Sequence, residues 1–215
     1  MAVSAKRMDA KHQAILQAAA SVFQAKGYPG TSMDEIAATA GVSKQTVYKH
    51  FADKEQLFHD IVLSTTDEIN ELVRMVAAAL DDTNDLEKDL RRLAKLFIAA
   101  LMEPKVLRLR RLVIANADRF PELGATWYER GFERVLSTLA SSFDRLAKRK
   151  LLHVADPMLA ADHFVGMLLW IPVNRAMFTG NHAYYTGRQL ERYADAAVSA
   201  FLSAHSSVPP ARSRR

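Results

Sequence analysis

Gly41 lies between two short amphipathic segments, and this arrangement restricts the fold more than any other feature of the chain. The run from Ser32 to Glu35 has the pattern of a capping box, which predicts that a short helix begins after Ser32. Gly41 permits the left-handed conformation that ends such a helix, and Ser43 can cap the next one. With an amphipathic stretch at about residues 9–26, these signals predict three short helices and a glycine-centred turn, the pattern of a helix-turn-helix.

The rest of the chain keeps the helical period of apolar residues, and no segment shows the two-residue alternation of a strand. Asp53 is placed to cap a long fourth helix that runs to about Leu80. Later helices are expected near residues 84–102, 105–118, 122–149, 157–179 and 187–205. We therefore expect an all-α fold of about nine helices, with a helix-turn-helix domain at residues 1–53, a connecting helix at 54–80, a ligand-binding and dimerisation domain at 81–206, and a disordered basic tail at 207–215.

The composition excludes several classes of protein. The 215-residue chain has no cysteine, so disulfides, thiolate metal sites and cysteine nucleophiles are excluded. The sequence shows neither a transmembrane stretch nor a secretory signal, and we expect a cytoplasmic protein without cofactor or metal. The net charge of +5 suits an anionic partner, but bulk charge is a weak argument because residues 1–60 carry a net charge of only +1.

The outer face of the third predicted helix carries hydrogen-bond donors, aromatic rings and positive charges, with almost no acid among them. Such a surface suits the major groove of DNA and its flanking phosphates. The residues of this face are Ser43, Lys44, Gln45, Thr46, Tyr48, Lys49 and His50.

The stretch from Thr31 to Phe58 resembles the DNA-binding domain of the TetR family of repressors. The Gly-Val-Ser, Tyr-x-His-Phe and Lys-Glu-x-Leu pieces occur in that family's order and spacing. The stretch from Leu112 to Leu123 resembles the C-terminal domain of the AefR-like branch of the family. The resemblance implies a repressor that binds a palindromic, double-stranded DNA operator as a homodimer and responds to a small-molecule effector.

The resemblance also implies roles for individual residues. Tyr48, His50 and Lys54 would contact phosphates, and Thr31 or Ser32 would lie against a phosphate at the start of the second helix. The side chains expected at base edges or nearby phosphates are Ser43, Lys44, Gln45, Thr46 and Lys49. Among them, Lys44 could address a guanine edge and Gln45 an adenine edge.

The C-terminal half carries many large apolar side chains, interrupted by the polar residues Asn116, His163 and Asn174. Each polar residue either orients a ligand in an apolar pocket or is simply satisfied by a backbone group. A pocket for a lipophilic or aromatic ligand is expected among Phe97, Leu112, Asn116, Phe120, Trp127, His163, Met167, Trp170 and Asn174. A dimer interface on the last two helices is expected at Phe164, Leu168, Leu190, Tyr193, Ala197 and Phe201.

Three other functions have to be weighed against a repressor. An enzyme is disfavoured because the seven histidines are scattered and no Gly-rich phosphate loop or GxSxG motif occurs. A protein that binds DNA without sequence preference is disfavoured by Gln45 and Thr46, which are suited to base readout. An activator stays open, and the sequence reveals neither the operator, the regulated genes nor the effector, nor whether the effector releases DNA or promotes binding.

Overall fold

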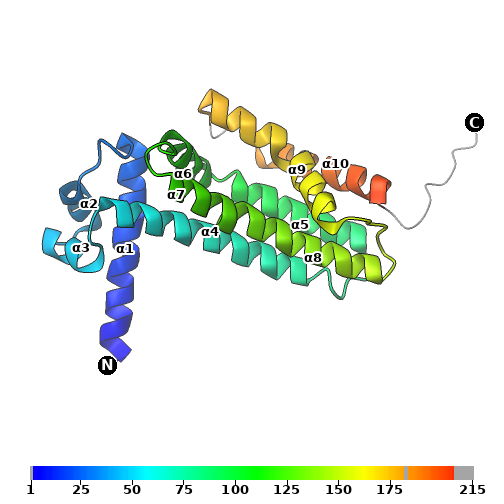
Figure 1. Cartoon of the computed structure of the whole chain (residues 1–215), viewed down its shortest axis with the longest axis horizontal. Helices are drawn as coiled ribbons and strands as arrows, with labels where there is room; N and C mark the ends of the chain where they lie inside the picture. The colour runs from blue at the N-terminus through cyan, green and yellow to red at the C-terminus, as the bar shows by residue number, and fades with distance from the viewer. Residues whose placement is uncertain (1, 182–183, 206–215) are drawn as a thin grey trace, which may run out of the picture. The chain divides into compact units, whose positions relative to one another are not determined.

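The computed structural model of the chain describes residues 2–181 and 184–205, with side chains from Ala10 onward (Figure 1). The tail expected at residues 207–215 lies outside the described residues. The described part contains α-helices and one π-helical segment and no β-strand, which confirms the all-α prediction.

The helices follow the predicted ranges closely. Because α7, the π-helical segment η1 and α8 are continuous, the described residues form nine separate helical rods. The expected single helix at 122–149 thus contains a π-helical turn that apolar periodicity did not predict. The elements are α1 (Ala2–Lys26), α2 (Met33–Ala40), α3 (Lys44–His50), α4 (Lys54–Ala78), α5 (Leu86–Leu101), α6 (Pro104–Ala115), α7 (Pro121–Thr126), η1 (Trp127–Glu133), α8 (Arg134–Lys148), α9 (Pro157–Thr179) and α10 (Gly187–His205).

The chain divides into two units. The first comprises the chain up to Thr66 together with Arg108–Trp127, and the second comprises Asp67–Leu107 together with the chain from Tyr128 onward. The division differs from the expected 1–53 and 81–206, because the end of α6 and all of α7 belong with the N-terminal helices.

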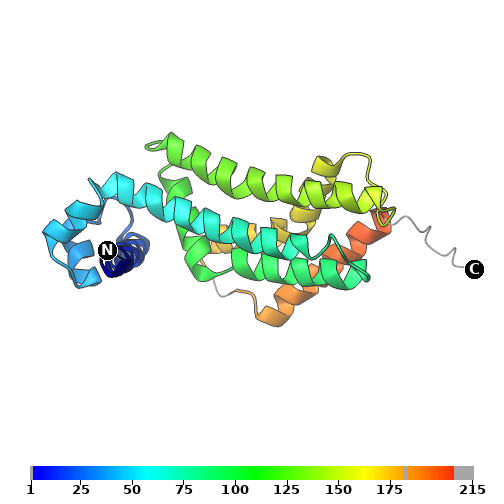
Figure 2. The same ribbon diagram turned by 90° about the horizontal axis from the view of Figure 1, so that it is seen from below.

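The first unit contains the helix-turn-helix, and Figure 2 looks along α1 with α2 and α3 beside it. Its core brings α1, α2, α3 and the start of α4 together with the end of α6 and α7. Aromatic rings fill the centre: Tyr28 lies 5.6 Å from Phe23, 5.5 Å from Phe58 and 4.7 Å from Phe120 between ring centroids. Burial of these rings stabilises the core against which α3 packs.

The predicted N-caps of α2 and α3 and the glycine that ends α2 are present. The Ser32 hydroxyl accepts from the Glu35 amide at 3.3 Å, and the Ser43 hydroxyl accepts from the Thr46 amide at 3.1 Å. Gly41 between them is left-handed, with φ 65° and ψ 31°. Only half of the capping box forms, because the Glu35 carboxylate lies 2.5 Å from the Lys26 ammonium instead.

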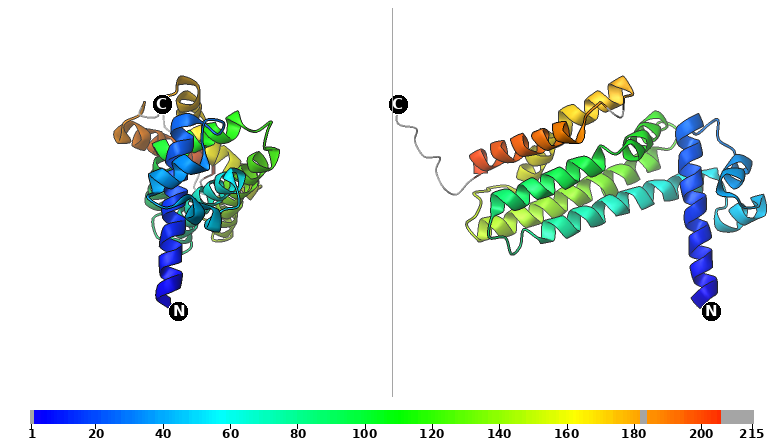
Figure 3. Two further views of the ribbon diagram at one scale, coloured as in Figure 1. Left: turned by 90° about the vertical axis from the view of Figure 1, so that its left-hand side faces the viewer. Right: turned by 180° about the vertical axis from the view of Figure 1, so that it is seen from behind.

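In the second unit, α10 packs against α5 and α9, and α9 also packs against α8 (Figure 3). The centre of this packing is a cluster of three fully buried rings, in which Phe143 and Phe164 lie 4.9 Å and 5.2 Å from Phe201. Within the same unit, the Asn70 side-chain amide of α4 donates to the Arg130 carbonyl of η1 at 2.5 Å. This bond gives one carbonyl of the π-helical turn a partner.

Candidate nucleic-acid interface

The third helix presents two different faces. Val47 is fully buried in the core of the first unit, whereas Gln45, Tyr48 and Lys49 are exposed. Tyr48 leaves 46% of its surface exposed, a large fraction for an aromatic residue. The arrangement leaves an amide, a phenol and an ammonium on the outside of a short helix whose inner face is held by packing.

The two hydroxyl residues at the start of α3 are already engaged with each other and with the backbone. The Ser43 and Thr46 side-chain oxygens lie 2.8 Å apart, in addition to the capping bond from the Thr46 amide. Hydroxyl groups accept through two lone pairs and donate once, so capacity for a further hydrogen bond remains. These residues position α3 and also lie on its exposed N-terminal end.

Lys44 makes an ion pair across the turn. Its ammonium lies 2.7 Å from Asp34 of α2 and 6.0 Å from the centre of the Tyr48 ring. The hydrogen bond to Asp34, together with the charge of that carboxylate, raises the pKa of Lys44. Lys44 therefore has to exchange Asp34 for any new partner, and Asp34 also places a negative charge beside this face.

The start of α2 offers one accessible side chain rather than two. Thr31 is buried, and its hydroxyl donates to the Gly27 carbonyl at 2.8 Å. Ser32 is exposed and serves as the N-cap of α2. Of the two residues expected near a phosphate, Ser32 is the one accessible at the N-terminus of the helix.

Lys54, the first residue of α4, is tied to the turn between α1 and α2. Its ammonium donates to the Tyr28 and Thr31 carbonyls, both at 2.9 Å, and lies 4.4 Å from the centre of the Tyr28 ring. Burial, and then the charge of Arg119, lower the pKa of Lys54. The sequence predicted only a phosphate contact for Lys54 and did not reveal this internal role. The two bonds to carbonyls use two of the three N–H donors of the ammonium.

His50, the last residue of α3, lies in a small ring cluster with α1. Its ring centroid is 5.8 Å from that of His12, and the His12 ring stacks on Phe51 at 4.6 Å. Burial is the largest cause that lowers the pKa of His50, followed by the charges of His12, Lys49 and Lys11. His50 is therefore half-buried in a locally positive environment.

Two family matches cover most of the chain. Residues 15–61 match the family described as bacterial regulatory proteins, tetR family. Residues 88–206 match the C-terminal domain described as that of an AefR-like transcriptional repressor, and this match alone spans more than half of the 215 residues. The chain belongs to the TetR family. Members of this family are DNA-binding transcription factors, not enzymes.

Solved structures and curated relatives agree with this membership. A TetR-family transcriptional regulator from Mesorhizobium loti shares 52% identity over 93% of this chain and 98% of that chain, with a TM-score of 0.87. The flavonoid-responsive regulator FrrA shares 28% identity over 94% of this chain and 100% of that chain, with a TM-score of 0.70. The HTH-type transcriptional activator FasR of Mycolicibacterium smegmatis shares 38% identity over 89 residues, which are 41% of this chain and 39% of FasR. The match therefore spans about two fifths of the length of that curated relative.

The residues expected to line the ligand pocket of this TetR-family chain fall into different units and environments. Leu112 and Phe120 belong to the core of the first unit, and the partly buried Trp127 packs against that core. Phe97 is buried on α5 in the second unit. His163, Met167 and Trp170 are exposed on α9.

The polar members of the expected pocket are satisfied locally. The Asn116 amide donates to the Leu112 carbonyl at 2.8 Å, and the Asn174 amide donates to the Trp170 carbonyl at 2.7 Å. Both asparagine side chains are therefore hydrogen-bonded to a backbone carbonyl one helical turn away, as in the alternative that needs no ligand. His163 is exposed to solvent on α9 and does not interrupt a buried apolar wall.

Most of the residues expected in the dimer interface lie on the inner faces of their helices. Phe164, Leu168 and Phe201 are fully buried, and Ala197 is nearly so, within the chain's own second unit. They form its internal core and have no surface to offer a partner, while Leu190 and Tyr193 are half-buried. On α9, which is apolar on nearly every side, periodicity could not separate the inner face from the outer one. On α10, the apolar stripe that carries Ala197 and Phe201 is the face packed against α5 and α9 within the same chain.

The outer face of α9 carries large apolar side chains, of which only Met167 and Trp170 were expected in the ligand pocket. Trp170 is 68% exposed and Phe178 is 88% exposed. Gly166 lies on the same exposed side, with no atom within 4 Å of where a Cβ would stand. We call this surface the outer α9 face; its large apolar residues are Met158, Leu159, Met167, Trp170, Ile171 and Phe178.

No group of three or more His, Asp or Glu side chains in the described part of the chain could hold a metal ion. No helix there is both long and apolar enough to cross a membrane.

Proposed function

We propose that this TetR-family chain is a transcriptional repressor that binds a palindromic operator as a homodimer and that a small lipophilic or aromatic ligand changes its affinity for DNA. The observation that carries the proposal is the exposed side of α3. It presents Gln45, Tyr48 and Lys49 on a helix whose buried residue, Val47, and whose Ser43 cap fix its position.

In this proposal α3 enters the major groove. Gln45 is able to pair with an adenine through its amide, and Lys44 with a guanine after it leaves Asp34. Ser43 and Thr46 lie at the N-terminal end of the same helix, within reach of the groove. Because ammonium, phenol and imidazole groups all carry N–H or O–H donors for phosphate oxygens, Tyr48, Lys49 and His50 contact the sugar–phosphate backbone beside it.

A second set of phosphate contacts is assigned to the start of α2 and to α4. Ser32 is exposed where the free amides of α2 attract an anion, and the buried Thr31 holds the preceding turn. Lys54 has one N–H left for a phosphate after its two bonds to carbonyls. Its larger contribution is to hold the turn in front of α2.

We assign the homodimer contact to the outer α9 face. An exposed apolar surface of this kind is unusual on a monomer and is typical of an interface. A second copy is the partner because a two-fold axis pairs the face with itself, and Gly166 allows close approach of the two helices. Burial in the dimer would cover the Trp170 and Phe178 rings. A homodimer carries two copies of α3, one for each half of a palindromic operator.

The ligand proposal rests on family membership and on the relatives rather than on a cavity. FrrA is described as flavonoid-responsive, and a flavonoid is an aromatic, lipophilic molecule. For this chain we propose only a ligand of the same general class, aromatic and lipophilic. The AefR-like match supports repression, whereas FasR is described as an activator. A reporter assay with the native promoter distinguishes the two, since a repressor lowers transcription and an activator raises it. A protein that acts on the chromosome in this way works in the cytoplasm.

Selection of bound sequences from a random DNA pool tests the proposal. We expect an enriched inverted repeat whose half-sites are about one helical turn apart or a multiple of it. A pool that enriches no motif would contradict sequence-specific binding. An enriched single half-site without symmetry would contradict the homodimer.

A further inference from the structure

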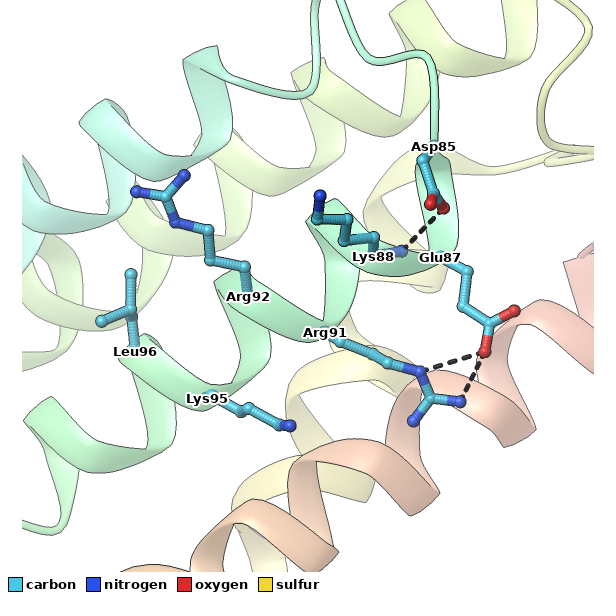
Figure 4. Close-up of a pocket in the computed structure, with 7 residues that line it drawn as sticks. All are labelled: Asp85, Glu87, Lys88, Arg91, Arg92, Lys95 and Leu96. Carbon is cyan, nitrogen blue, oxygen red and sulfur yellow. Dashed lines mark hydrogen bonds and ion pairs between the residues drawn. The ribbon is translucent and has the colours of Figure 1, made fainter.

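A groove of about 660 Å³ lies along α5 in the second unit, on the side of the helix away from its buried residues (Figure 4). Its lining forms two parallel rows with a spacing of four residues, which places neighbours of a row one above the other. One row is Glu87, Arg91 and Lys95, and the other is Lys88, Arg92 and Leu96.

The first row is neutralised and anchored within the fold. The Arg91 guanidinium donates to Glu87 at 3.0 and 2.6 Å and lies 3.0 Å from the Asp195 carboxylate of α10. Lys95 lies 3.1 Å from the same carboxylate. Burial opposes the ionisation of Asp195, but its hydrogen bonds with Lys95 and Arg91 lower its pKa overall. These cations are held in place and have their charges compensated.

The second row has no such compensation. Within residues 10–181 and 184–205, the side-chain nitrogens of Lys88 and Arg92 form no ion pair at 4.0 Å or less. Both side chains extend to the same side of α5 in Figure 4, where Leu96 follows them with 38% of its surface exposed. Like charges at this spacing repel each other, so a bound anion would relieve the repulsion.

We propose that this groove binds a small organic anion, with a carboxylate or phosphate head at Lys88 and Arg92 and a short apolar body against Leu96. A guanidinium presents paired donors that match the oxygens of either head, and the ammonium adds a second charge. The methylene stems of the two cations and the Leu96 side chain supply apolar surface for the body. The inference is independent of the operator and of the aromatic-ligand proposal.

A small anion fits the groove better than a nucleic acid does. Asp85 and Glu87 stand at the N-terminal end of the groove, so the unpaired positive charge is confined to a short stretch of one helix. A duplex carries a charge about every 1.7 Å along its axis and is bound by extended basic surfaces. The Asp85 carboxylate, which forms no ion pair at 4.0 Å or less within the described side chains, would repel its neighbouring phosphates.

Backbone amide NMR of the full-length, nitrogen-15-labelled chain without DNA tests the proposal. The probes are hexanoate and hexyl phosphate, with acetate and inorganic phosphate as head-only probes and hexanol as a body-only probe. We expect saturable shifts at amides 85–96 with the two hexyl anions and about tenfold weaker binding of each head-only probe and of hexanol. Comparison of the two hexyl anions shows which head the groove prefers.

The double variant K88Q/R92Q is expected to lose about tenfold or more in affinity for the hexyl anions. Gln is a good helix former, so α5 should persist, and unchanged amide signals of the helix would verify this. The control R188Q/R192Q removes the same charge from exposed positions of α10 and should bind as the wild type does.

Four results would overturn the proposal. They are the absence of saturable shifts at amides 85–96, equal affinity in K88Q/R92Q and the wild type, hexanol binding as tightly as hexanoate, and an equal loss in R188Q/R192Q. Displacement of hexanoate by a short DNA duplex of arbitrary sequence would instead identify a nucleic-acid surface and would also contradict a small-anion site.

Discussion

Helices α3 and α9 illustrate two different relations between sequence and surface. In α3, polarity separates the faces, since Val47 is buried while Gln45 and Lys49 are exposed. In α9 both faces are apolar, since Phe164 is fully buried while Trp170 is 68% exposed. A polar outer face can be recognised from the sequence, whereas an apolar outer face cannot be distinguished from the buried one.

A functional surface can be located from sequence only where its chemistry differs from that of the core. A surface that meets water or DNA differs chemically from the core behind it. A surface that meets another copy of the chain resembles the core, because both are buried in the assembled protein. If burial decides these roles, the two faces of α9, and the two kinds of residue around α3, should respond differently to substitution.

Replacing Phe164 by Ala should have the largest effect, a loss of about 3–5 kcal/mol in the free energy of unfolding. Its ring packs 5.7 Å from Phe143 and 5.2 Å from Phe201, so truncation leaves a cavity in the second unit. Trp170→Ala on the same helix should leave the folded monomer intact and dissociate the dimer. Urea denaturation at several protein concentrations, with light scattering after size exclusion, separates the two effects. A dimeric Trp170→Ala, or one unfolded as severely as Phe164→Ala, would show that the face assignment is wrong.

Lys54→Met should lower the free energy of unfolding by about 1.5–3 kcal/mol, because two charge-assisted hydrogen bonds to carbonyls are lost. Lys49→Met, on the exposed face of α3, should change it by no more than about 0.5 kcal/mol. Thermal and urea unfolding without DNA measure both. Equal stabilities of the two variants would mean that Lys54 has no internal role and is available entirely for DNA.

Gly41→Ala should cost about 1–2 kcal/mol, because a side chain disfavours the left-handed backbone at φ 65°. Gly124→Ala in α7 should instead stabilise the fold by about 0.5–1 kcal/mol. At both positions no atom lies within 4 Å of the added Cβ, so the pair isolates backbone conformation from steric clash. Unfolding midpoints of the two variants should move in opposite directions, and a shift in the same direction would refute this explanation.

The smallest effect concerns His50, whose pKa in the folded chain is lowered by burial and by neighbouring positive charge. Below its ordinary pKa of 6.5 the unfolded chain binds more protons at this residue than the folded chain does. Stability should therefore rise with pH through the region just below 6.5 and fall as the pH is lowered. His50→Gln should flatten this dependence in unfolding measurements between mildly acidic and neutral pH. An unchanged slope in the variant would assign the dependence to other groups.

The sequence was sufficient for the fold and for the candidate DNA face because their signals are local. The Ser32 and Ser43 caps and the Gly41 stop each depend on a few neighbouring residues, and the structure has all three as predicted. The same holds for the Asp53 carboxylate, which accepts from the Gln56 amide at 2.8 Å at the start of α4.

What the sequence could not provide depends on contacts between distant segments. The internal bonds of Lys54 link it to residues 23 and 26 positions earlier. The π-helical turn at η1 is accompanied by a bond between Asn70 and Arg130, which are 60 positions apart. Assignment of Leu112 and Phe120 to the first unit likewise required knowledge of which helices pack together, since position along the chain suggested the C-terminal domain.

Operator binding by Gln45→Ala tests the central claim, that the exposed side of α3 reads DNA, most directly. Fluorescence anisotropy would compare the variant with the wild type on the selected operator and on operators changed at one base pair in each half-site. The matched control is Gln13→Ala, an exposed glutamine on α1. We expect Gln45→Ala to lose about 1–3 kcal/mol of discrimination at a single base pair of each half-site, while the control discriminates as the wild type does. Wild-type discrimination by Gln45→Ala at every base pair would contradict the account.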